Sequence, residues 1–592
     1  MSEIQKRVAQ LRELMKQKGI DAWIVPSSDA HNSEYVAEYW KGRAWISGFT
    51  GSAGTAVIGL EQAGLWTDGR YHIQAEKELE GSGINLFRAG NPDVQTLSEW
   101  LADTLPENST IGFDGRTFSQ AQTKTLLKDF GDKPVKLDSS HDLLSAIWED
   151  RPALSKAPAF IHDVSFAGKG SEEKIKDIRD EMAKKKATSH LVSTLDDIAW
   201  ALNLRGNDIA MNPVFASYLL ITENSSSLYV DQDKISDDVS AYLKSINVEA
   251  KAYDQAWADL SSLETKSILL NPMTTSRAVF DALPEAVEVV EGKSPSTLMK
   301  SLKNDTEVKQ YRETLCKDGV AITRFMKWLE DNVPGGEVTE LSAEKQLQAF
   351  RAMEDGYTED SFRTIAGYRE HGAMMHYAAD ETSNVTVKPG SFFLVDSGGQ
   401  YPGGTTDITR TFCFGDLTEQ ERRDYTLVLQ GVIDLSMAVF MKGSRGCNLD
   451  ILARGPQWKE GINYGCGTGH GVGFFLNVHE GPQGFSQAMV DVPLQPGMVI
   501  TNEPGIYREG LHGVRIENIM LVKEFTQTEF GTFYNFESIT LAPICTKAIN
   551  VDQLTTAQRD WLNSYHAEVY KQLAPRMTDD EQAYLKKVTA AI

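Results

Sequence analysis

The chain of 592 residues is longer than one hydrophobic core usually serves, which predicts roughly three domains. Its 41% hydrophobic and 24% charged residues are typical of a globular protein and exclude disordered and fibrous classes. The formal net charge of −24 argues against a nucleic-acid partner, because phosphate binding needs clustered Lys and Arg.

The first helix is expected near the N-terminus, where Ile4, Val8, Leu11 and Met15 share one face among charged residues. This segment has no apolar stretch like that of a secretory signal, and no later run is long and apolar enough to cross a membrane. The cysteines are odd in number and scattered, which suits a reducing compartment. We therefore expect a cytoplasmic protein without a membrane partner. The five cysteines are Cys316, Cys413, Cys447, Cys466 and Cys545.

An internal repeat organises the first half of the chain. "LRELMKQKGIDAWIVPSSD" (11–29) aligns with "IRDEMAKKKATSHLVSTLD" (178–196), each an amphipathic helix followed by a short apolar strand. "WISGFTG" and "WALNLRG" follow in the same order, and then "TAVIGLEQAGLWTD" and "YLLITENSSSLYVD" each predict a pair of strands. The shared order predicts two related α/β domains, residues 1–155 and 156–303. A third domain, 304–592, begins with a helix that has Asn304 as N-cap and Glu307 three residues later.

Two acids flank a glycine-rich turn in "SFFLVDSGGQYPGGTTDITRTFCFG" (391–415). The glycines permit a tight turn that would bring two strands antiparallel, with Asp396 and Asp407 facing each other. Facing carboxylates repel each other unless a cation or a shared proton lies between them.

Further metal-binding residue types follow in the same domain. "GCGTGHGVGFFLNVHEGP" (465–482) carries His470 and His479, and the apolar strand in "VITNEPGIY" ends at Glu503. In "GVRIENIMLV", predicted as one strand, Arg515 and Glu517 share a face. Four carboxylates and one imidazole supply mostly hard oxygen ligands, enough for two divalent cations with bridging carboxylates.

These segments resemble the signature blocks of the pita-bread metallopeptidases, and most closely those of aminopeptidase P, the Xaa-Pro aminopeptidases. "HYAADETS", "DSGGQYPGGTTDITRTF", "GTGHGVGFFLNVHEGP", "NEPGIY" and "VRIEN" occur in the family's order. The resemblance covers essentially the whole chain. It implies an α/β (α+β) protein with two creatinase-like N-terminal domains, a pita-bread catalytic domain and a C-terminal extension at about 548–592. It also implies a homodimer, the commonest closed symmetry.

The resemblance implies a role for each matched residue. One metal ion would be bound by Asp396, and the other by His470 and Glu503, with Asp407 and Glu517 bridging both. The expected ion is Mn²⁺, with Zn²⁺ and Co²⁺ as alternatives. A hydroxide between the ions would hydrolyse the bond before a penultimate proline. Glu503 would be the general base, His479 would hydrogen-bond the oxyanion or the scissile carbonyl, and His376 would hold the peptide beyond the cleaved bond. Arg515 and Tyr507 match positions that are either structural or substrate-orienting, and Arg70 matches a position that reaches toward the substrate.

One position departs from the family pattern. Many members have a histidine, assigned as a proton shuttle, four residues before the metal-binding one, and this chain has Cys466 there. A thiol with a pKa of about 8.5 suits proton relay less well at neutral pH, so we expect Cys466 to fill space.

Three other functions compete with the aminopeptidase. Prolidase shares the ligands and acts on Xaa-Pro dipeptides, but the duplicated N-terminal half favours the longer enzyme. Creatinase-like members keep the fold without the metal centre, whereas this chain has all five ligands. Non-catalytic pita-bread modules that bind peptides or histones have lost ligands and often carry acidic tails, whereas this chain ends in "DEQAYLKKVTAAI".

Overall fold

The computed structural model describes residues 2–592, whose contacts divide them into two units. The first unit runs up to His162 and includes Lys169–Ser296, and the second consists of Asp163–Gly168 and Thr297–Ile592. Among the described residues, no helix is both long and apolar enough to span a bilayer.

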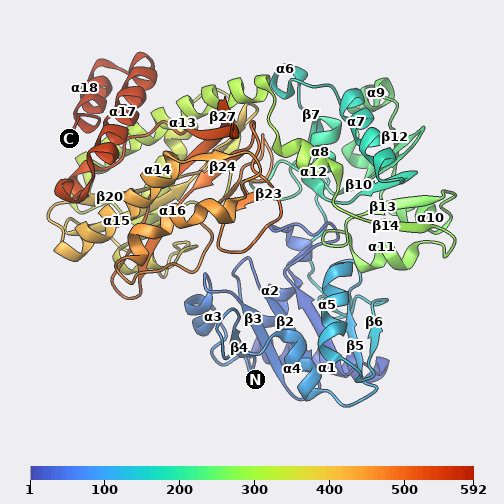
Figure 1. Ribbon diagram of the computed structural model, residues 1–592. Coiled ribbons are helices and arrows are strands. Elements are labelled where there is room, and N and C mark those ends of the chain that lie inside the picture. Colours follow the sequence, from blue (N-terminus) through green and yellow to red (C-terminus); the bar gives the residue numbers. More distant parts are fainter. Residues whose placement is uncertain (1) are drawn as a thin grey trace. The chain divides into compact units, whose positions relative to one another are not determined.

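The first N-terminal domain is a mixed sheet with helices (Figure 1). Its strands lie in the order β4-β3-β2-β1-β5-β6. The amphipathic helix α1 begins with a capping box at Ser2 and buries Val8, Leu11 and Met15. The helices are α1 (Glu3–Lys18), α2 (Gly42–Ser47), α3 (His72–Glu78), α4 (Leu97–Thr104) and α5 (Gln120–Phe130). The strands are β1 (Ala22–Pro26), β2 (Thr55–Gly59), β3 (Ala63–Thr67), β4 (Asn85–Arg88), β5 (Thr110–Phe113) and β6 (Lys136–Asp138).

The second domain repeats this arrangement, with the strand order β12-β11-β10-β8-β13-β14. Its helices are α7 (Ser171–Lys184), α8 (Leu195–Leu202), α9 (Asp237–Ser245), α10 (Gln255–Ser261) and α11 (Arg277–Ala282). Its strands are β8 (Ser189–Val192), β10 (Ser217–Thr222), β11 (Ser226–Val230), β12 (Glu249–Ala252), β13 (Ser267–Leu270) and β14 (Glu288–Glu291). The short strands β7 (Phe160–Ile161) and β9 (Leu204–Arg205) pair with each other in the first unit. Helix α6 (Val164–Ala167) belongs to the second unit, and the chain passes from the first unit to the second within α12 (Pro295–Ser301).

The pairing directions of the two sheets agree strand by strand. β1 pairs antiparallel with β2 and parallel with β5, and β8 pairs antiparallel with β10 and parallel with β13. The outer pairs β3·β4 and β11·β12 are both parallel, as are β5·β6 and β13·β14. The prediction of two related α/β domains is therefore confirmed, while the boundaries at 155/156 and 303/304 stay predictions.

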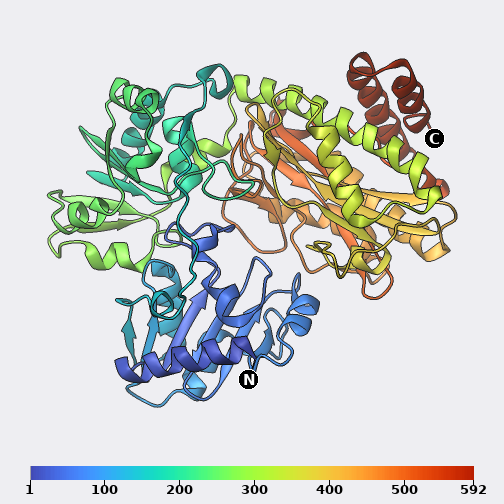
Figure 2. The same cartoon turned by 180° about the vertical axis from the view of Figure 1, so that it is seen from behind.

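The second unit packs long helices on both faces of curved sheets. Helices α13 (Asp305–Asn332) and α14 (Glu340–Arg351) lie in front in Figure 2, and α15 (Glu419–Ser436) and α16 (Gly446–Trp458) lie in front in Figure 1. Alternation along β24 explains the two layers, because Val499 packs with α13 residues and Ile500 with α15 and α16 residues. The predicted start of α13 is confirmed by a capping box between Asn304 and Glu307.

Several sheets lie between these helices, and the largest has the order β21-β28-β27-β24-β22-β23. A smaller sheet, β16-β17-β20, carries the acids of the glycine-rich motif. The bounds are β15 (Glu359–Asp360), β16 (Ile365–Tyr368), β17 (Ser391–Ser397), β18 (Gly399–Tyr401), β19 (Gly404–Thr405), β20 (Ile408–Phe414), β21 (Val439–Met441), β22 (Gly469–Gly471), β23 (Glu480–Phe485), β24 (Val499–Asn502), β25 (Gly505–Arg508), β26 (His512–Arg515), β27 (Asn518–Thr528) and β28 (Gly531–Ser538).

Two local predictions need correction. Strands β17 and β20 do pair antiparallel, but no simple tight turn joins them, because residues between them form the strands β18 and β19 of a separate small sheet. The segment 513–522 is not one strand: β26 ends at Arg515 and pairs with β25, whereas β27 begins at Asn518 and pairs with β24. The chain leaves one sheet and enters another between these points, and Glu517 lies in that junction.

The C-terminal helices α17 (Thr556–Leu573) and α18 (Asp579–Val588) share a hydrophobic core with α15. Arg410 of β20 is fully enclosed at this junction and is 2% exposed. Its guanidinium donates to the carbonyl oxygens of Glu517 (2.6 Å), Ala542 (2.9 Å) and Pro543 (3.0 Å), and to the Tyr565 hydroxyl of α17 (3.0 Å). One side chain thus connects the motif strand, the residue Glu517 and the C-terminal extension.

Candidate metal centre

Asp396 and Asp407 reach the centre from neighbouring strands. Asp396 lies near the end of β17, opposite Thr409 of β20, and Asp407 directly precedes β20. The intervening backbone needs glycine at position 398, because a Cβ there would lie 1.9 Å from the Thr406 carbonyl oxygen. The Asp396 Oδ2 accepts a hydrogen bond from Arg515 Nη2 at 2.7 Å, while its buried Oδ1 has no hydrogen-bond partner.

His470 presents one ring nitrogen to the acids. Its Nε2 lies 3.3 Å from Asp407 Oδ2 and 3.5 Å from Glu503 Oε1. The Nδ1 lies 2.8 Å from the Gly471 carbonyl oxygen, which fixes the proton on Nδ1 and leaves Nε2 free to bind a cation. Burial alone would lower the pKa of His470, but Asp407 and Glu503 raise it to about 9.

Glu503 and Glu517 lie where strands end. Glu503 follows β24, and its backbone N–H donates to the Thr468 carbonyl oxygen at 2.8 Å. Glu517 is anchored by Thr409, whose hydroxyl donates to Oε2 at 2.8 Å and whose carbonyl oxygen accepts from the Glu517 N–H at 3.1 Å. Its other oxygen, Oε1, is buried without a hydrogen-bond partner.

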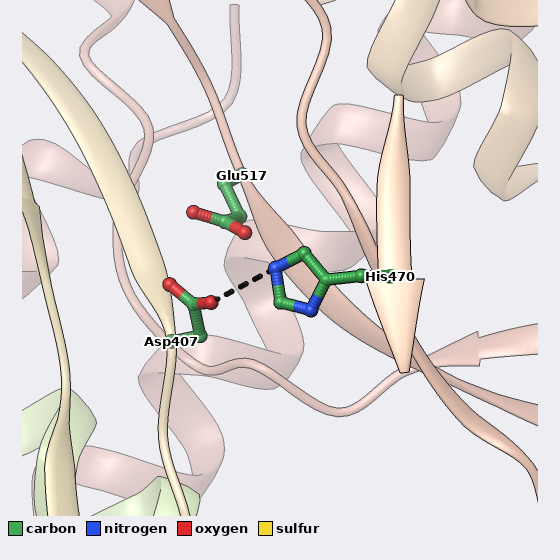
Figure 3. Close-up of side chains that lie close together, drawn as sticks. All are labelled: Asp407, His470 and Glu517. Carbon is green, nitrogen blue, oxygen red and sulfur yellow. Dashed lines mark ion pairs between the residues drawn. The ribbon is translucent and has the colours of Figure 1, made fainter. Parts of the chain in front are cut away.

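Three of the predicted ligands converge closely. Ligand atoms of Asp407, His470 and Glu517 all lie within 4.8 Å of one another. Figure 3 shows the three side chains pointing toward one another. Burial, together with the other acids, raises the pKa of Glu517 well above its usual value. Burial also raises the pKa of Asp396 to about 7, although Arg515 opposes the rise. Buried acids with two unpartnered oxygens fit divalent cations, whose charge would compensate the carboxylates.

Arg515 and Tyr507 lie on the β25–β26 hairpin beside the acids. Arg515 Nη1 donates to the Tyr507 hydroxyl at 2.7 Å, and its Nε donates to the Thr409 hydroxyl at 3.1 Å. Burial raises the pKa of Tyr507 well above its usual value, so its hydroxyl stays neutral. Arg515 therefore connects Asp396 to the hairpin and to β20.

The two predicted substrate-binding histidines come from different loops. The His479 ring lies edge-on to the His470 ring, with centroids 4.2 Å apart. His376 is partly exposed in the loop after the 3-10 helix Arg369–Ala373. The residue before it touches the centre, because Arg515 Nη2 donates to the Met375 carbonyl oxygen at 3.3 Å.

Cys466 and Arg70 complete the predicted set. Burial and the Glu503 charge raise the pKa of the Cys466 thiol to about 11, so the thiol is neutral near pH 7. Arg70 belongs to the first unit, where it forms an ion pair with Asp68 in the turn before α3. Its contact with substrate stays a prediction.

Three buried charged groups near the site were not predicted from the sequence: Glu480, Glu340 and Arg410. Glu480, next to His479, forms ion pairs with Lys303 and, at 3.7 Å, with Lys300. Glu340, the first residue of α14, accepts hydrogen bonds from the loop that carries His376. Acids next to a metal motif or in the first turn of a helix are common, so the sequence does not single out Glu480 or Glu340. Arg410 did carry a signal, because "ITRTF" places a charged residue inside an apolar strand.

Family profiles match successive parts of the chain. The creatinase/prolidase N-terminal domain matches twice, at residues 7–147 and 150–307. Metallopeptidase family M24 matches residues 309–524, and the C-terminal region of peptidase M24 matches residues 532–592.

Full-length relatives agree with this order. A probable Xaa-Pro aminopeptidase P from Sordaria macrospora is 42% identical, over 97% of each chain. The structure of an X-prolyl aminopeptidase from Caenorhabditis elegans, described as a cytosolic enzyme with a di-nuclear active site, superposes with a TM-score of 0.96 at 32% identity and covers 100% of both chains. An Xaa-Pro dipeptidase from Bacillus anthracis, 25% identical with a TM-score of 0.52, covers 63% of this chain and 99% of its own. The chain therefore belongs to metallopeptidase family M24, among the Xaa-Pro aminopeptidase P proteins.

Proposed function

We propose that this protein is a metal-dependent Xaa-Pro aminopeptidase, which hydrolyses the bond between an N-terminal residue and a penultimate proline. The observation that carries the proposal is the cluster of Asp407, His470 and Glu517, with buried unpartnered oxygens on Glu517 and Asp396. Full-length similarity to aminopeptidase P proteins supplies the substrate class.

The length of the match favours an aminopeptidase over a prolidase-type dipeptidase. The dipeptidase similarity covers 63% of the chain, whereas the aminopeptidase similarity includes both N-terminal domains. A non-catalytic peptide-binding role is disfavoured because all five predicted ligands are present.

Two divalent cations fit the donor set. Asp396 would hold one ion, His470 and Glu503 would hold the other, and Asp407 and Glu517 would be shared by both. Oxygen-rich ligands with a single imidazole favour a hard ion, so we propose Mn²⁺. When bound, the cations supply Lewis acidity, which activates water and polarises a peptide carbonyl.

The protein's own residues would guide the reaction around the cations. Glu503 would accept a proton from the attacking water, and His479 would donate a hydrogen bond to the oxygen that develops negative charge. His376 would hold the peptide beyond the cleaved bond. Cytoplasmic location and a homodimer complete the proposal, and sedimentation equilibrium that gives only the monomer mass would contradict the dimer.

The decisive experiment compares peptides that differ at one position. The holoenzyme should release Arg from Arg-Pro-Pro and leave Arg-Ala-Pro intact, because a pocket shaped for the proline ring recognises a tertiary amide that lacks an N–H. Chelation should abolish the activity and Mn²⁺ should restore it, with Zn²⁺ and Co²⁺ compared in parallel. Comparable rates on the two peptides would refute the proposed specificity.

His479 provides a sharper test of the assigned roles. His479→Ala should retain bound metal but lower kcat by about 10²- to 10³-fold, the loss expected when one oxyanion donor is removed. Glu503→Ala should lose both activity and metal at its site. Full kcat in His479→Ala would show that its assigned role is wrong.

A further inference from the structure

Glu340 is a buried acid outside the proposed metal centre. It is the first residue of α14, its side chain is 0% exposed, and the helix N-terminus favours its negative charge. A carboxylate in such a place is costly unless several donors surround it. The donors around Glu340 come from one segment of the chain, residues 368–385.

Both ends of this segment bind the same carboxylate. The Tyr368 N–H donates to Oε1 at 2.8 Å, and the Val385 N–H donates to Oε2 at 3.4 Å. The Tyr377 hydroxyl donates to Oε2 at 2.9 Å, and the His371 Nδ1 lies 2.9 and 3.1 Å from the two oxygens. Burial and the charge of Glu340 raise the pKa of Tyr377, so its hydroxyl remains a donor.

The segment also contacts the metal centre. Arg515, which binds Asp396, donates to the Met375 carbonyl oxygen. The 3-10 helix Arg369–Ala373 lies so close to β26 that a Cβ at Gly513 would lie 1.7 Å from the Gly372 carbonyl oxygen. The neighbours of His376 in the chain are therefore both held in place. Met375 is bound by Arg515, and Tyr377 is bound by Glu340.

We propose that Glu340 is a positioning residue that holds His376 at the substrate site. The proposal rests on the proposed function, because it assigns Glu340 an effect on a residue that would hold the peptide. Glu340 itself touches no predicted ligand or substrate. It acts by fixing both ends of the loop, and a displacement of about 1 Å in a positioning group can cost about a hundred-fold in rate.

Kinetics of the holoenzyme test this positioning. Glu340→Gln and Glu340→Ala should raise KM for Arg-Pro-Pro and lower kcat/KM by roughly ten- to a hundred-fold, with metal content unchanged. Glu344→Gln, one turn further along α14, is the matched control and should behave as wild type. A purely structural defect would instead lower the active fraction, which reduces apparent kcat at constant KM, and that result overturns the proposal.

A double-mutant cycle separates Glu340 from His376. If Glu340 acts through His376, Glu340→Gln should cost little in a His376→Ala background. Additive losses overturn the proposal. Tyr377→Phe removes one donor and leaves the acid in place, so it repeats the test if the Glu340 variants do not fold.

Hydrogen exchange gives a readout that does not require activity. Glu340→Ala should lose amide protection within 368–385 and retain it elsewhere in the second unit, and unchanged protection overturns the proposal. Wild-type enzyme that fails to cleave Arg-Pro-Pro would refute the proposed function alone, since the exchange result still decides whether Glu340 holds the loop.

Discussion

Asp396 illustrates how burial changes the chemistry of a single carboxyl group. In the absence of cations its pKa rises to about 7, and that of Glu517 also rises well above its usual value. The neighbouring His470 is shifted in the same direction, to about 9, because it faces acids. All three groups therefore bind protons more tightly in the folded metal-free protein than in the unfolded chain.

The stability of the metal-free protein should consequently fall as pH rises. A group whose pKa is higher in the folded state than in the unfolded state stabilises the fold when it is protonated. That contribution is complete below the unfolded-state pKa and is lost as the pH rises through the folded-state pKa, which is about 7 for Asp396 and about 9 for His470. Between about pH 5.5 and about pH 8.5 the shifts of Asp396 and His470 together correspond to a loss in the free energy of unfolding on the order of 4 kcal/mol. Denaturant titrations of the chelated protein at several pH values measure this change in the free energy of unfolding. Asp396→Asn should flatten the slope, and stability that increases with pH would contradict the prediction.

Cys466 should be dispensable for turnover. Its thiol is neutral near pH 7, and a neutral thiol behaves as a small hydrophobe. We expect Cys466→Ala to change kcat/KM by less than about three-fold and Cys466→His to be tolerated or mildly activating. Cys447→Ala serves as the control. A loss above about a hundred-fold in Cys466→Ala would instead place the thiol on a proton path.

Which residues the sequence could indicate depends on where their partners lie. Asp407, His470 and Glu517 belong to short motifs, and the structure brings their ligand atoms within 4.8 Å. Glu340 could not be found in this way, because its partners lie 28 to 45 residues further along the chain. No local pattern marks an acid whose function depends on such distant donors.

At the scale of elements, short-range order was predictable and the paths between sheets were not. Helix periodicity and capping residues determine where α1 and α13 begin, and alternation identifies the paired strands. The break at Ile516 and Glu517 carries no turn residue, because the chain there is guided by tertiary partners such as Thr409. Residues 513–522 pass from one sheet to another, but their apolar sequence has the pattern of a single strand.

Two neighbouring elements of the second unit carry thiols in contact. Cys413 Sγ of β20 lies 3.5 Å from Cys545 Sγ, in the segment after β28. The hydrogen bond from Cys413 and the nearby Lys547 lower the pKa of Cys545 to about 7, which favours the reactive thiolate.

Hydrogen peroxide should therefore join Cys413 and Cys545. The two thiols lose two protons and two electrons, and peroxide is reduced to two waters. Peptide mapping should find this disulfide, and closing so long a loop should stabilise the protein by about 4 to 5 kcal/mol. Cys545→Ser should abolish the crosslink, whereas Cys447→Ser should not. Oxidation without this linkage would contradict the prediction.

At the scale of the whole molecule, the fold class followed from the repeated order of elements. The two N-terminal domains share one strand order because both copies retain the same succession of helix, strand and hairpin. The pita-bread domain was identified from its motifs, since its sheets are assembled from strands distant in sequence. No hydrophobic pattern specifies which strands meet there.

The C-terminal extension should be required for the metal centre. Removal of residues 548–592 would expose apolar side chains of α15 and would leave Arg410 without its Tyr565 partner. Arg410→Ala is the milder version, and we expect it to lower the Mn²⁺ affinity by ten-fold or more, as changes behind metal ligands do. Calorimetric titration measures this affinity, with the partly exposed Arg559→Ala of α17 as control. Unchanged affinity would show that the extension serves another purpose.

The contacts of Arg410 with Glu517 and Tyr565 also affect how genetic variation in this protein would be interpreted. A premature stop codon in α17 at or before Tyr565 leaves every predicted ligand in the translated chain, yet it removes the Tyr565 contact to Arg410 and the C-terminal helices that share a core with α15. Such an allele should behave like a ligand mutation and respond to added manganese. Missense changes at Tyr565 should belong to the same phenotypic class, although Tyr565 lies in the C-terminal extension.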